Sequence, residues 1–227
     1  MIVQPVFSIA IDGPAGAGKS SIAKLLAKRL GAIYLDTGAM YRTVALYMHQ
    51  HGYLGADDIR KNVNAPEIEV KFIDGRQHMI LDGKDVSKEI RSPEASMFAS
   101  RVSAIPEVRE RLVALQREIA KGHSVVMDGR DIGTKVLPNA TLKVYLTASC
   151  EVRAERRYKE LKEKDPTVTL EGITEDILKR DFNDAHREAS PMVQAADAVR
   201  VDSSDMTPEE VVSAIIDLLK KAQASEA

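Results

Sequence analysis

The segment Gly13-Pro-Ala-Gly-Ala-Gly-Lys-Ser20 constrains the fold more than any other part of the chain. It matches the pattern G-x-x-x-x-G-K-[ST], in which glycines let consecutive backbone N–H groups close around phosphate oxygens. The apolar residues 6–11 before it predict a buried strand, and residues 19–30 after it carry apolar side chains on one helical face. Because the loop ends at a helix N-terminus, which favours anions, the segment predicts a nucleotide-binding site.

Two side chains of this segment suit a bound triphosphate. Lys19 can reach the β- and γ-phosphates, and the Ser20 hydroxyl can ligate Mg²⁺. The chain lacks the N/T-K-x-D and D-x-x-G motifs of GTPases, so we predict ATP with Mg²⁺ as the ligand. The residues predicted to bind ATP are Gly13, Pro14, Ala15, Gly16, Ala17, Gly18, Lys19, Ser20 and Ser21.

Strand and helix patterns alternate along most of the 227 residues. This alternation predicts a three-layer α/β fold with a mostly parallel, five-stranded sheet. After the first strand, further strands are expected at 32–35, 124–127, 142–146 and 199–201. Helices are expected at 19–30, 39–51, from 92 and from 106 onward, at 149–163, at 174–189 and after Thr207.

The pattern changes near residue 66, where apolar and charged side chains alternate. Asp74-Gly75 and Asp82-Gly83 are turn signals, so this region predicts an antiparallel meander of about three strands. We interpret it as a lobe inserted into a single domain that spans residues 1–227. The core would comprise 1–55 and 93–227, the insert about 56–92, and a short lid about 153–165.

Composition argues against several other classes. A formal net charge of −2 gives no overall basic field, so we expect neither nucleic-acid nor membrane binding. The chain shows no apolar run near the roughly 18 residues of a membrane span and no signal-peptide pattern. A single cysteine, Cys150, excludes an internal disulfide and indicates a reducing compartment. We expect a cytoplasmic protein, and its evenly spread charge favours a monomer.

Phosphate transfer to a second substrate needs another anion site, and several segments offer arginines for it. Residues 36–42 end in an arginine and follow the second predicted strand, where open α/β sheets bind ligands. Asp128-Gly-Arg-Asp131 directly follows an apolar strand. Arg180, Asp184 and Arg187 share one helix face. A capped helix or an exposed ion-pair ladder could each explain one segment, but together they indicate an acceptor-phosphorylating enzyme.

Two features leave alternatives open. Arg153, Arg156 and Arg157 form either a solvated stripe or a mobile cationic lid over ATP. Asp128 ends its strand where it could support Mg²⁺ from behind or could simply hold the loop. Both interpretations of each feature are compatible with the sequence.

On these residues the chain resembles the bacterial cytidylate kinases, which phosphorylate CMP and dCMP with Mg-ATP. The resemblance covers essentially the whole length. It includes the segments Ile11–Ser20, Asp36–Arg42 and Asp128–Gly133, the tail from Ser190 to Asp197, and the meander. It implies a cytoplasmic transferase of pyrimidine nucleotide metabolism that turns CMP or dCMP into CDP or dCDP.

The resemblance also implies a role for each residue that matches the family pattern. Arg42, Arg130 and Arg187 would hold the CMP phosphate, and Ser100, Arg109 and Asp131 would read the cytosine edge. Arg180 and Asp184 would contact the sugar. Thr37 would lie beside the nucleotide, where family members often carry Ser. The residues expected to act in the transfer itself are Lys19, Arg130, Arg153, Arg157 and Arg187.

A carboxylate beside a guanidinium is complementary to cytosine, whose exocyclic amine donates while N3 and O2 accept. Uracil would instead turn an oxygen toward Asp131. An unpaired buried polar group of this kind costs about 1–3 kcal/mol. That corresponds to a preference of about tenfold to hundredfold for cytosine.

Two other functions fit parts of the sequence. The same scaffold could phosphorylate UMP or an acceptor that is not a nucleotide. A different class would be an ATPase whose cycle regulates a partner, although the arginine-rich segments argue against it. Release of ADP without any acceptor would distinguish that ATPase from a kinase.

Overall fold

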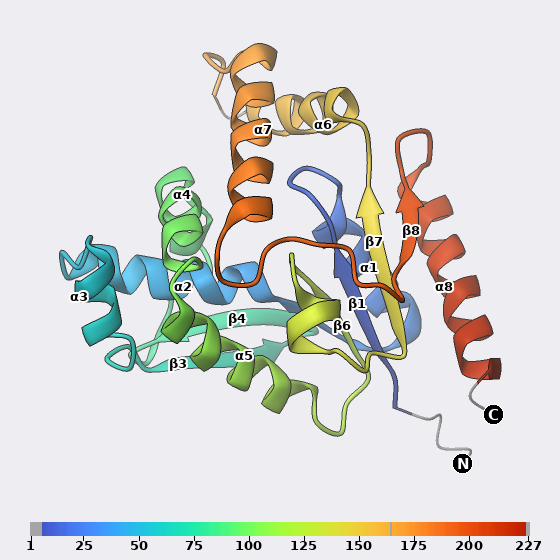
Figure 1. Ribbon diagram of the computed structural model, residues 1–227, viewed down its shortest axis with the longest axis horizontal. Helices are drawn as coiled ribbons and strands as arrows, with labels where there is room; N and C mark the ends of the chain where they lie inside the picture. Colours follow the sequence, from blue (N-terminus) through green and yellow to red (C-terminus); the bar gives the residue numbers. More distant parts are fainter. Residues whose placement is uncertain (1–5, 164, 226–227) are drawn as a thin grey trace.

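Five parallel strands form the central sheet of the computed structural model, which describes residues 6–163 and 165–225 (Figure 1). They are β1 Ser8–Asp12, β2 Ile33–Asp36, β6 Val125–Asp128, β7 Leu142–Thr147 and β8 Val199–Asp202. Their order across the sheet is β2-β6-β1-β7-β8, and each pairing is parallel. The predicted five-stranded sheet is confirmed, with the strand before the glycine loop at its centre.

Helices cover both faces of this sheet, which gives the predicted three layers (Figure 1). They are α1 Lys19–Leu30, α2 Thr37–Gln50, α3 Ala56–Lys61, α4 Pro93–Val102, α5 Pro106–Ala120, α6 Cys150–Lys162, α7 Leu170–His186 and α8 Pro208–Ser225. Ile9 and Ile11 of β1 enter the core layer under α1 and α8, whereas Ala10 enters the layer under α2, α4 and α5. This alternation is the pattern of a strand buried on both faces.

The predicted meander is present as a second, antiparallel sheet of β3 Ile68–Ile73, β4 Arg76–Leu81 and β5 Lys84–Asp85. Met79 of β4 is buried in the core layer that contains α2, so the insert packs against the main domain. Gln77 also joins it to the end of β2, because the backbone N–H of Asp36 donates to its side-chain oxygen at 2.7 Å. The sequence did not predict α3, which precedes the meander, or the short helical turn Glu89–Arg91 that follows it.

Helix α7 covers 170–186, whereas the sequence predicted a helix over 174–189. It begins earlier because Thr169 caps it, accepting a hydrogen bond from the backbone N–H of Gly172 at 3.1 Å. It ends earlier because Arg187 has an extended backbone, with ψ 139°. Arg187 is therefore the first residue after the helix, and its backbone is extended like the start of a new segment.

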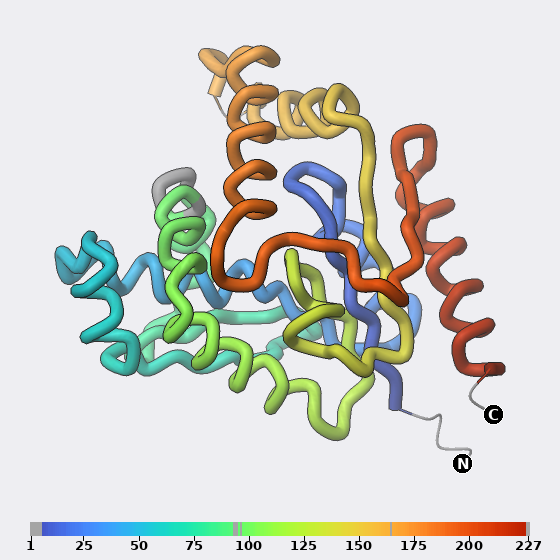
Figure 2. Tube along the Cα trace, in the orientation of Figure 1, coloured from blue at the N-terminus to red at the C-terminus, as the bar shows by residue number. Residues whose placement is uncertain are grey.

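The chain after α7 returns to the sheet and reaches the edge where β7 and β8 begin. Figure 2 shows this segment running past the loop that follows β6 before it reaches β8. Two contacts fix its path: the Met192 N–H donates to the Asp184 carbonyl oxygen at 2.7 Å, and Lys143 of β7 pairs with Asp197 at 2.7 Å. None of the described helices combines the length and apolar character that crossing a membrane requires.

Candidate active site

The glycine loop, residues 13–18, lies between β1 and α1 at the carboxyl end of the sheet. Gly13 has φ 146°, and a Cβ there would lie 2.0 Å from the carbonyl oxygen of Leu146. Gly16 and Gly18 have φ 76° and 84°, in the region that favours glycine. The backbone path of the loop therefore depends on these glycines, and it ends at a helix N-terminus that stabilises anions.

Lys19 is buried at the start of α1, and its Nζ donates to the carbonyl oxygen of Pro14 at 2.7 Å. Burial lowers the pKa of this ammonium group well below its ordinary value, and the charge of Arg130 lowers it further. The carboxylate of Asp128 opposes these effects. A negatively charged ligand in the loop would favour the charged form of Lys19.

Asp128, at the end of β6, links the start of α1 to the neighbouring strand β2. The Ser20 hydroxyl donates to Asp128 Oδ2 and the Tyr34 hydroxyl to Oδ1, each at 2.8 Å. The Thr37 hydroxyl donates to the Asp128 backbone oxygen at 2.7 Å. Burial and the negative charge of Asp36 raise the pKa of Asp128. A hydroxyl and a carboxylate side by side are the oxygen ligands that Mg²⁺ prefers, so these residues fit that ion.

A buried cluster of Arg109, Asp131 and Arg187 lies beyond the end of β6. Arg109 pairs with Asp131 Oδ2, and the Arg187 guanidinium lies 3.6 Å from Asp131 Oδ1. Tyr41 of α2 lies under Arg109, whose guanidinium carbon is 5.4 Å from the ring centroid. Burial and the charge of Arg109 lower the pKa of Arg187. Residues from α2, α5, the loop after β6 and the end of α7 thus meet at one point.

Two further arginines of the acceptor set are each held by a carboxylate. Arg130 Nε donates to Asp184 at 2.7 Å, and Arg42 donates to Asp36 at 3.1 Å. Burial alone would raise the pKa of Asp184, but the charge and hydrogen bond of Arg130 outweigh it and lower the pKa. A Cβ at Gly38 would lie 3.1 Å from the Arg42 guanidinium, so a side chain there would crowd this arginine.

Three guanidinium nitrogens in this region are buried without a hydrogen-bond partner in the described structure: Arg42 Nε, Arg109 Nε and Arg187 Nη2. Buried donors are almost always paired in proteins, and an unmade bond to a charged group is costly. An anionic, hydrogen-bond-accepting ligand would supply the missing partners. This is the strongest sign of a second anion site.

Arg180 adds a charge on the α7 face that carries Asp184. Although Arg180 remains exposed, partial removal from water and the charge of Arg130 lower the pKa of its guanidinium to about 10. Asp184 opposes this change, while Arg42 and Arg157 add to it. Cations from α2, α6 and α7 and from the loop after β6 therefore converge on one region, where polyphosphate would relieve their repulsion.

The arginines expected in a lid face three different ways. Arg153 is buried and donates to the carbonyl oxygen of Ala15 in the glycine loop at 2.8 Å. Arg156 instead donates to the backbone oxygen of Ser203 at 2.6 Å, which ties α6 to the end of β8. Arg157 is exposed and pairs with Glu160 one turn along. The three do not form one stripe.

Ser100 is the predicted site residue with the least support from contacts. It lies half-buried on α4, and its hydroxyl has no hydrogen-bond partner among the residues whose side chains the structure describes, 6–92, 95, 97–163 and 165–225. Its backbone oxygen accepts a bond from the Ser103 hydroxyl at 2.9 Å. The structure brings together Arg109 and Asp131 of the predicted base-reading set, but it does not connect Ser100 to them.

Asp12 is a central residue that the sequence reasoning missed. Its carboxylate accepts hydrogen bonds from the backbone N–H groups of Ile132 and Gly133 at 2.8 and 2.7 Å. Burial raises the pKa of Asp12 to about 6, with Asp131 adding to the increase and the two amides opposing it. The residue before the glycine loop thus holds the turn that carries Asp131.

Tyr34, Tyr41 and Asp181 were also missed, because no local motif marks them. Tyr34 orients Asp128, Tyr41 supports Arg109, and Asp181 contacts the glycine loop. The available signal was positional: Tyr34 lies in the predicted strand before the segment 36–42, Tyr41 lies within that segment, and Asp181 follows Arg180.

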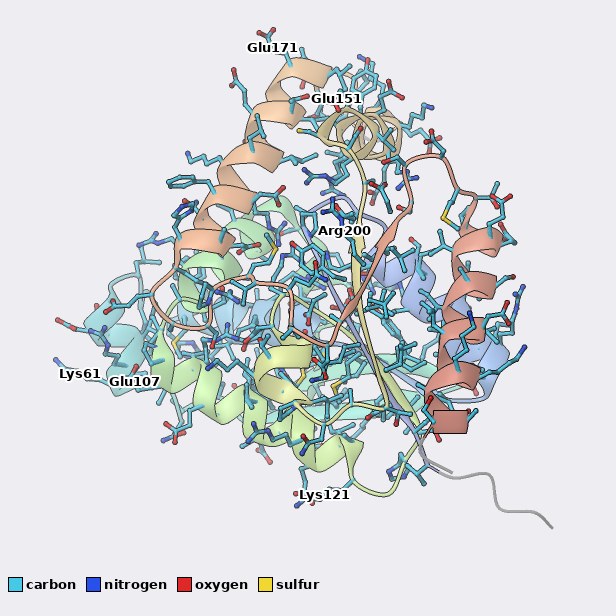
Figure 3. The ribbon with its side chains drawn as sticks, turned by 45° about the vertical axis from the view of Figure 1, so that its right-hand side comes forward. Lys61, Glu107, Lys121, Glu151, Glu171 and Arg200 are labelled. Carbon is cyan, nitrogen blue, oxygen red and sulfur yellow. The ribbon has the colours of Figure 1, made fainter. Side chains whose placement is uncertain are left out.

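Charges outside the site contrast with those within it. Glu107 and Lys121, labelled in Figure 3, lie on the periphery of the molecule and are exposed. Arg109 is only two residues beyond Glu107 on α5, yet it is buried at 5% exposure. Most charged side chains remain on the surface, whereas those of the site, such as Arg109 and Asp131, are buried.

Comparison with known proteins gives concordant results. A family model described as cytidylate kinase matches residues 9–221. The chain is 52% identical to a cytidylate kinase of Caldicellulosiruptor bescii, over 96% of this chain and 98% of that protein. It is 49% identical to a cytidylate kinase of Fervidobacterium nodosum, over 94% of this chain and 96% of that protein. The solved structure of an uncharacterized protein from Eubacterium ventriosum has a TM-score of 0.52 to this chain at 13% sequence identity, and the match covers 94% of this chain and 98% of that protein. At this low identity the likeness supports the fold alone.

Proposed function

Since this chain belongs to the cytidylate kinase family, we propose that it transfers the γ-phosphate of ATP to CMP or dCMP. The products are ADP and CDP or dCDP. One observation beyond the family carries the proposal: three guanidinium nitrogens of the arginine cluster are buried without hydrogen-bond partners, and the charge of Arg130 from the same region acts on Lys19. They supply an acceptor site for a second anion beside the site for ATP.

Residues 13–21 form the donor half. Backbone N–H groups of the loop bind the phosphates, and Lys19 leaves the Pro14 carbonyl to reach the β- and γ-phosphates. Ser20, with Asp128 behind it, would hold Mg²⁺, and the ion would supply positive charge beside the phosphates. The protein mainly aligns the reactants and neutralises charge, which are the principal requirements of phosphoryl transfer.

The acceptor phosphate is held by Arg42, Arg130 and Arg187. Arg42 and Arg187 each have a buried donor without a partner, and a phosphate oxygen accepts from them. Arg130 is kept in place by Asp184, so it presents its remaining N–H groups without losing its orientation. CMP supplies its own phosphate oxygen as the nucleophile, so no separate general base is needed.

Arg109 and Asp131 read the base. Their ion pair is buried, and the Asp131 carboxylate accepts from the exocyclic amine of cytosine while Arg109 donates to N3 or O2. Ser100, which lies half-buried on α4, is the third member of this set. Arg180 and Asp184 contact the sugar, and Thr37 lies beside the nucleotide, already bonded to the end of β6.

Closure keeps water from the γ-phosphate during transfer. We assign the moving parts to the insert, about 56–92, and to a lid of about 153–165, with 1–55 and 93–227 as the core. Arg157 from the lid and Arg153, which its bonds to Ala15 and Asp181 hold in place at the start of that segment, stabilise the charge of the transferring phosphoryl group. Arg157 must turn from Glu160 to do so, and it is exposed enough to move.

One chain supplies all of these residues, so we also propose that the enzyme acts as a monomer. We propose a cytoplasmic location as well, because its substrates are nucleotide metabolites. Light scattering on the purified protein should give one mass close to 24.9 kDa. A mass near twice that value would contradict the monomer.

A coupled ADP-release assay tests the function. With Mg-ATP, we expect rapid ADP release with CMP and dCMP, and rates about tenfold to hundredfold lower with UMP. AMP and GMP serve as further controls. Equal rates with UMP and CMP would overturn the base assignment. Release of ADP without any acceptor would support an ATPase instead.

A further inference from the structure

Helix α7 contacts the glycine loop through one carboxylate, that of Asp181. The Ala15 backbone N–H donates to Asp181 Oδ1 at 2.9 Å. Arg153 pairs with Asp181 Oδ2 and also donates to the Ala15 carbonyl oxygen at 2.8 Å. The peptide groups of Ala15, the carboxylate and the guanidinium thus form a closed ring of hydrogen bonds.

This ring leaves little freedom to the loop or to Arg153. Arg153 is buried, and its Nε donates to the carbonyl oxygen of Ala148 at 3.1 Å, just beyond β7. A Cβ at Gly16 would lie 3.1 Å from the Arg153 Cβ, so α6 packs directly on the loop. The loop's first half is therefore supported from outside by two helices that come much later in the chain.

The same helix also holds the acceptor half. Asp184, one turn after Asp181, pairs with Arg130 at 2.7 Å, and Arg187 follows the end of α7 beside Asp131. Figure 1 shows α7 beside α6 and next to the loop between β1 and α1. A shift of α7 would therefore disturb both halves, whereas loss of the Asp181 carboxylate alone would disturb the donor half.

We propose that Asp181 is a positioning residue that fixes Ala15 and Arg153 for the binding of ATP. The inference rests on the proposed function for its biological meaning, but the contacts themselves concern only the nucleotide loop. The carboxylate is compensated by Arg153, so it does not act as a free negative charge beside the phosphates. It holds the loop's backbone and the lid arginine in register before ATP arrives.

Asp181→Asn separates this role from simple repulsion of phosphate. Asparagine keeps the shape but has only one oxygen and no charge, so it cannot hold both the Ala15 N–H and Arg153. If Asp181 positions the loop, ATP should bind about tenfold more weakly, as expected for loss of a charge-assisted hydrogen bond. If Asp181 merely repelled phosphate, the variant would bind ATP more tightly.

Calorimetric titration of a non-hydrolysable ATP analogue into the full-length protein, without CMP, measures this directly. The matched control is Asp176→Asn, an exposed aspartate on the same helix. We expect about tenfold weaker analogue binding for Asp181→Asn, no change for the control, and CMP binding within about twofold of wild type for both. Unchanged or tighter analogue binding by Asp181→Asn would overturn the proposal.

A double-mutant cycle with Arg153→Ala checks the route of the effect. Asp181 acts partly through Arg153 and also holds the Ala15 N–H directly, so the loss in the double variant should be smaller than the sum of the two single losses. Fully additive losses would contradict that route. Thermal unfolding in parallel identifies any variant that fails to fold. Because the readout is ATP-analogue binding, absence of CMP phosphorylation by the wild type would overturn the function without deciding the role of Asp181.

Discussion

The donor and acceptor halves of the site are built on different principles. The donor loop is continuous in sequence, and its functional side chains already have partners: Lys19 bonds to Pro14 and Ser20 to Asp128. The acceptor half is assembled from four distant segments and keeps buried guanidinium nitrogens without partners. A contiguous loop can be completed by its own backbone, whereas the distributed arginine set is completed by its ligand.

Carboxylates explain how the acceptor half stays folded without a ligand. Asp36 and Asp184 each hold one of its arginines, and Asp131 contacts two of them. These pairs neutralise part of the positive charge and fix the orientation of the guanidinium groups. Substitutions in the donor half should therefore affect transfer of phosphate, while substitutions in the acceptor half should affect the choice of substrate.

The largest expected effect is in the donor half. Lys19→Ala should lower kcat by about 10²-fold or more, because it removes a preorganised charge from the transferring phosphoryl group. Lys28→Ala, an exposed lysine in the last turn of α1, is the control and should leave kcat unchanged. Steady-state kinetics at saturating CMP measures both. Near-normal turnover by Lys19→Ala would contradict the assignment of Lys19 to the phosphoryl-transfer step.

The next effect is in the acceptor half. Asp131→Asn should lower turnover of CMP by about tenfold to hundredfold and narrow the gap between CMP and UMP, because the acceptor for the cytosine amine and the partner of Arg109 are weakened. Glu107→Gln, on the same helix as Arg109 but exposed, is the matched control. An unchanged ratio of CMP to UMP turnover would count against base reading by Asp131.

The smallest expected effect concerns Asp12, which joins the two halves. Its pKa is raised from 3.8 to about 6 in the folded protein, so its contribution to stability is full below pH 3.8 and is lost as the pH rises through 6. Between pH 5 and pH 7 this loss amounts to about 1 kcal/mol.

Urea unfolding of wild type and Asp12→Asn at pH 5, 6 and 7 measures this contribution. The wild type should lose free energy of unfolding between pH 5 and pH 7 as Asp12 loses its proton, whereas Asp12→Asn should not show this loss. The stability of the variant relative to the wild type should therefore increase as the pH rises. Parallel curves would show that Asp12 does not titrate in this range.

Much of the fold was predictable, because local signals agreed with the final structure. The bounds of α1, 19–30, follow from flanking glycines with left-handed backbones, Gly18 and Gly31. Strand alternation revealed the meander and the parallel sheet. The start of α7 was missed because the Thr169 cap is a weak signal beside the polar residues around it. The short α3 lacks enough residues to show a helical period.

The site was less predictable wherever a role depends on tertiary contacts. The glycine loop could be identified because the residues that bind phosphate are consecutive in the sequence. Asp181 is one of many charged residues on α7, and only the packing of that helix on the loop brings it to Ala15. Arg156 looked equivalent to its neighbours, yet it is directed toward Ser203. Sequence spacing gives a helix face but not the element that the face meets.

The most direct test of the two-anion site is to identify the products by ³¹P nuclear magnetic resonance. The wild-type protein with Mg-ATP and CMP should yield CDP and ADP in equal amounts, and with Mg-ATP alone it should release no inorganic phosphate. Inorganic phosphate in place of CDP would contradict the account, because it would mean that the arginines opposite the glycine loop do not hold an acceptor.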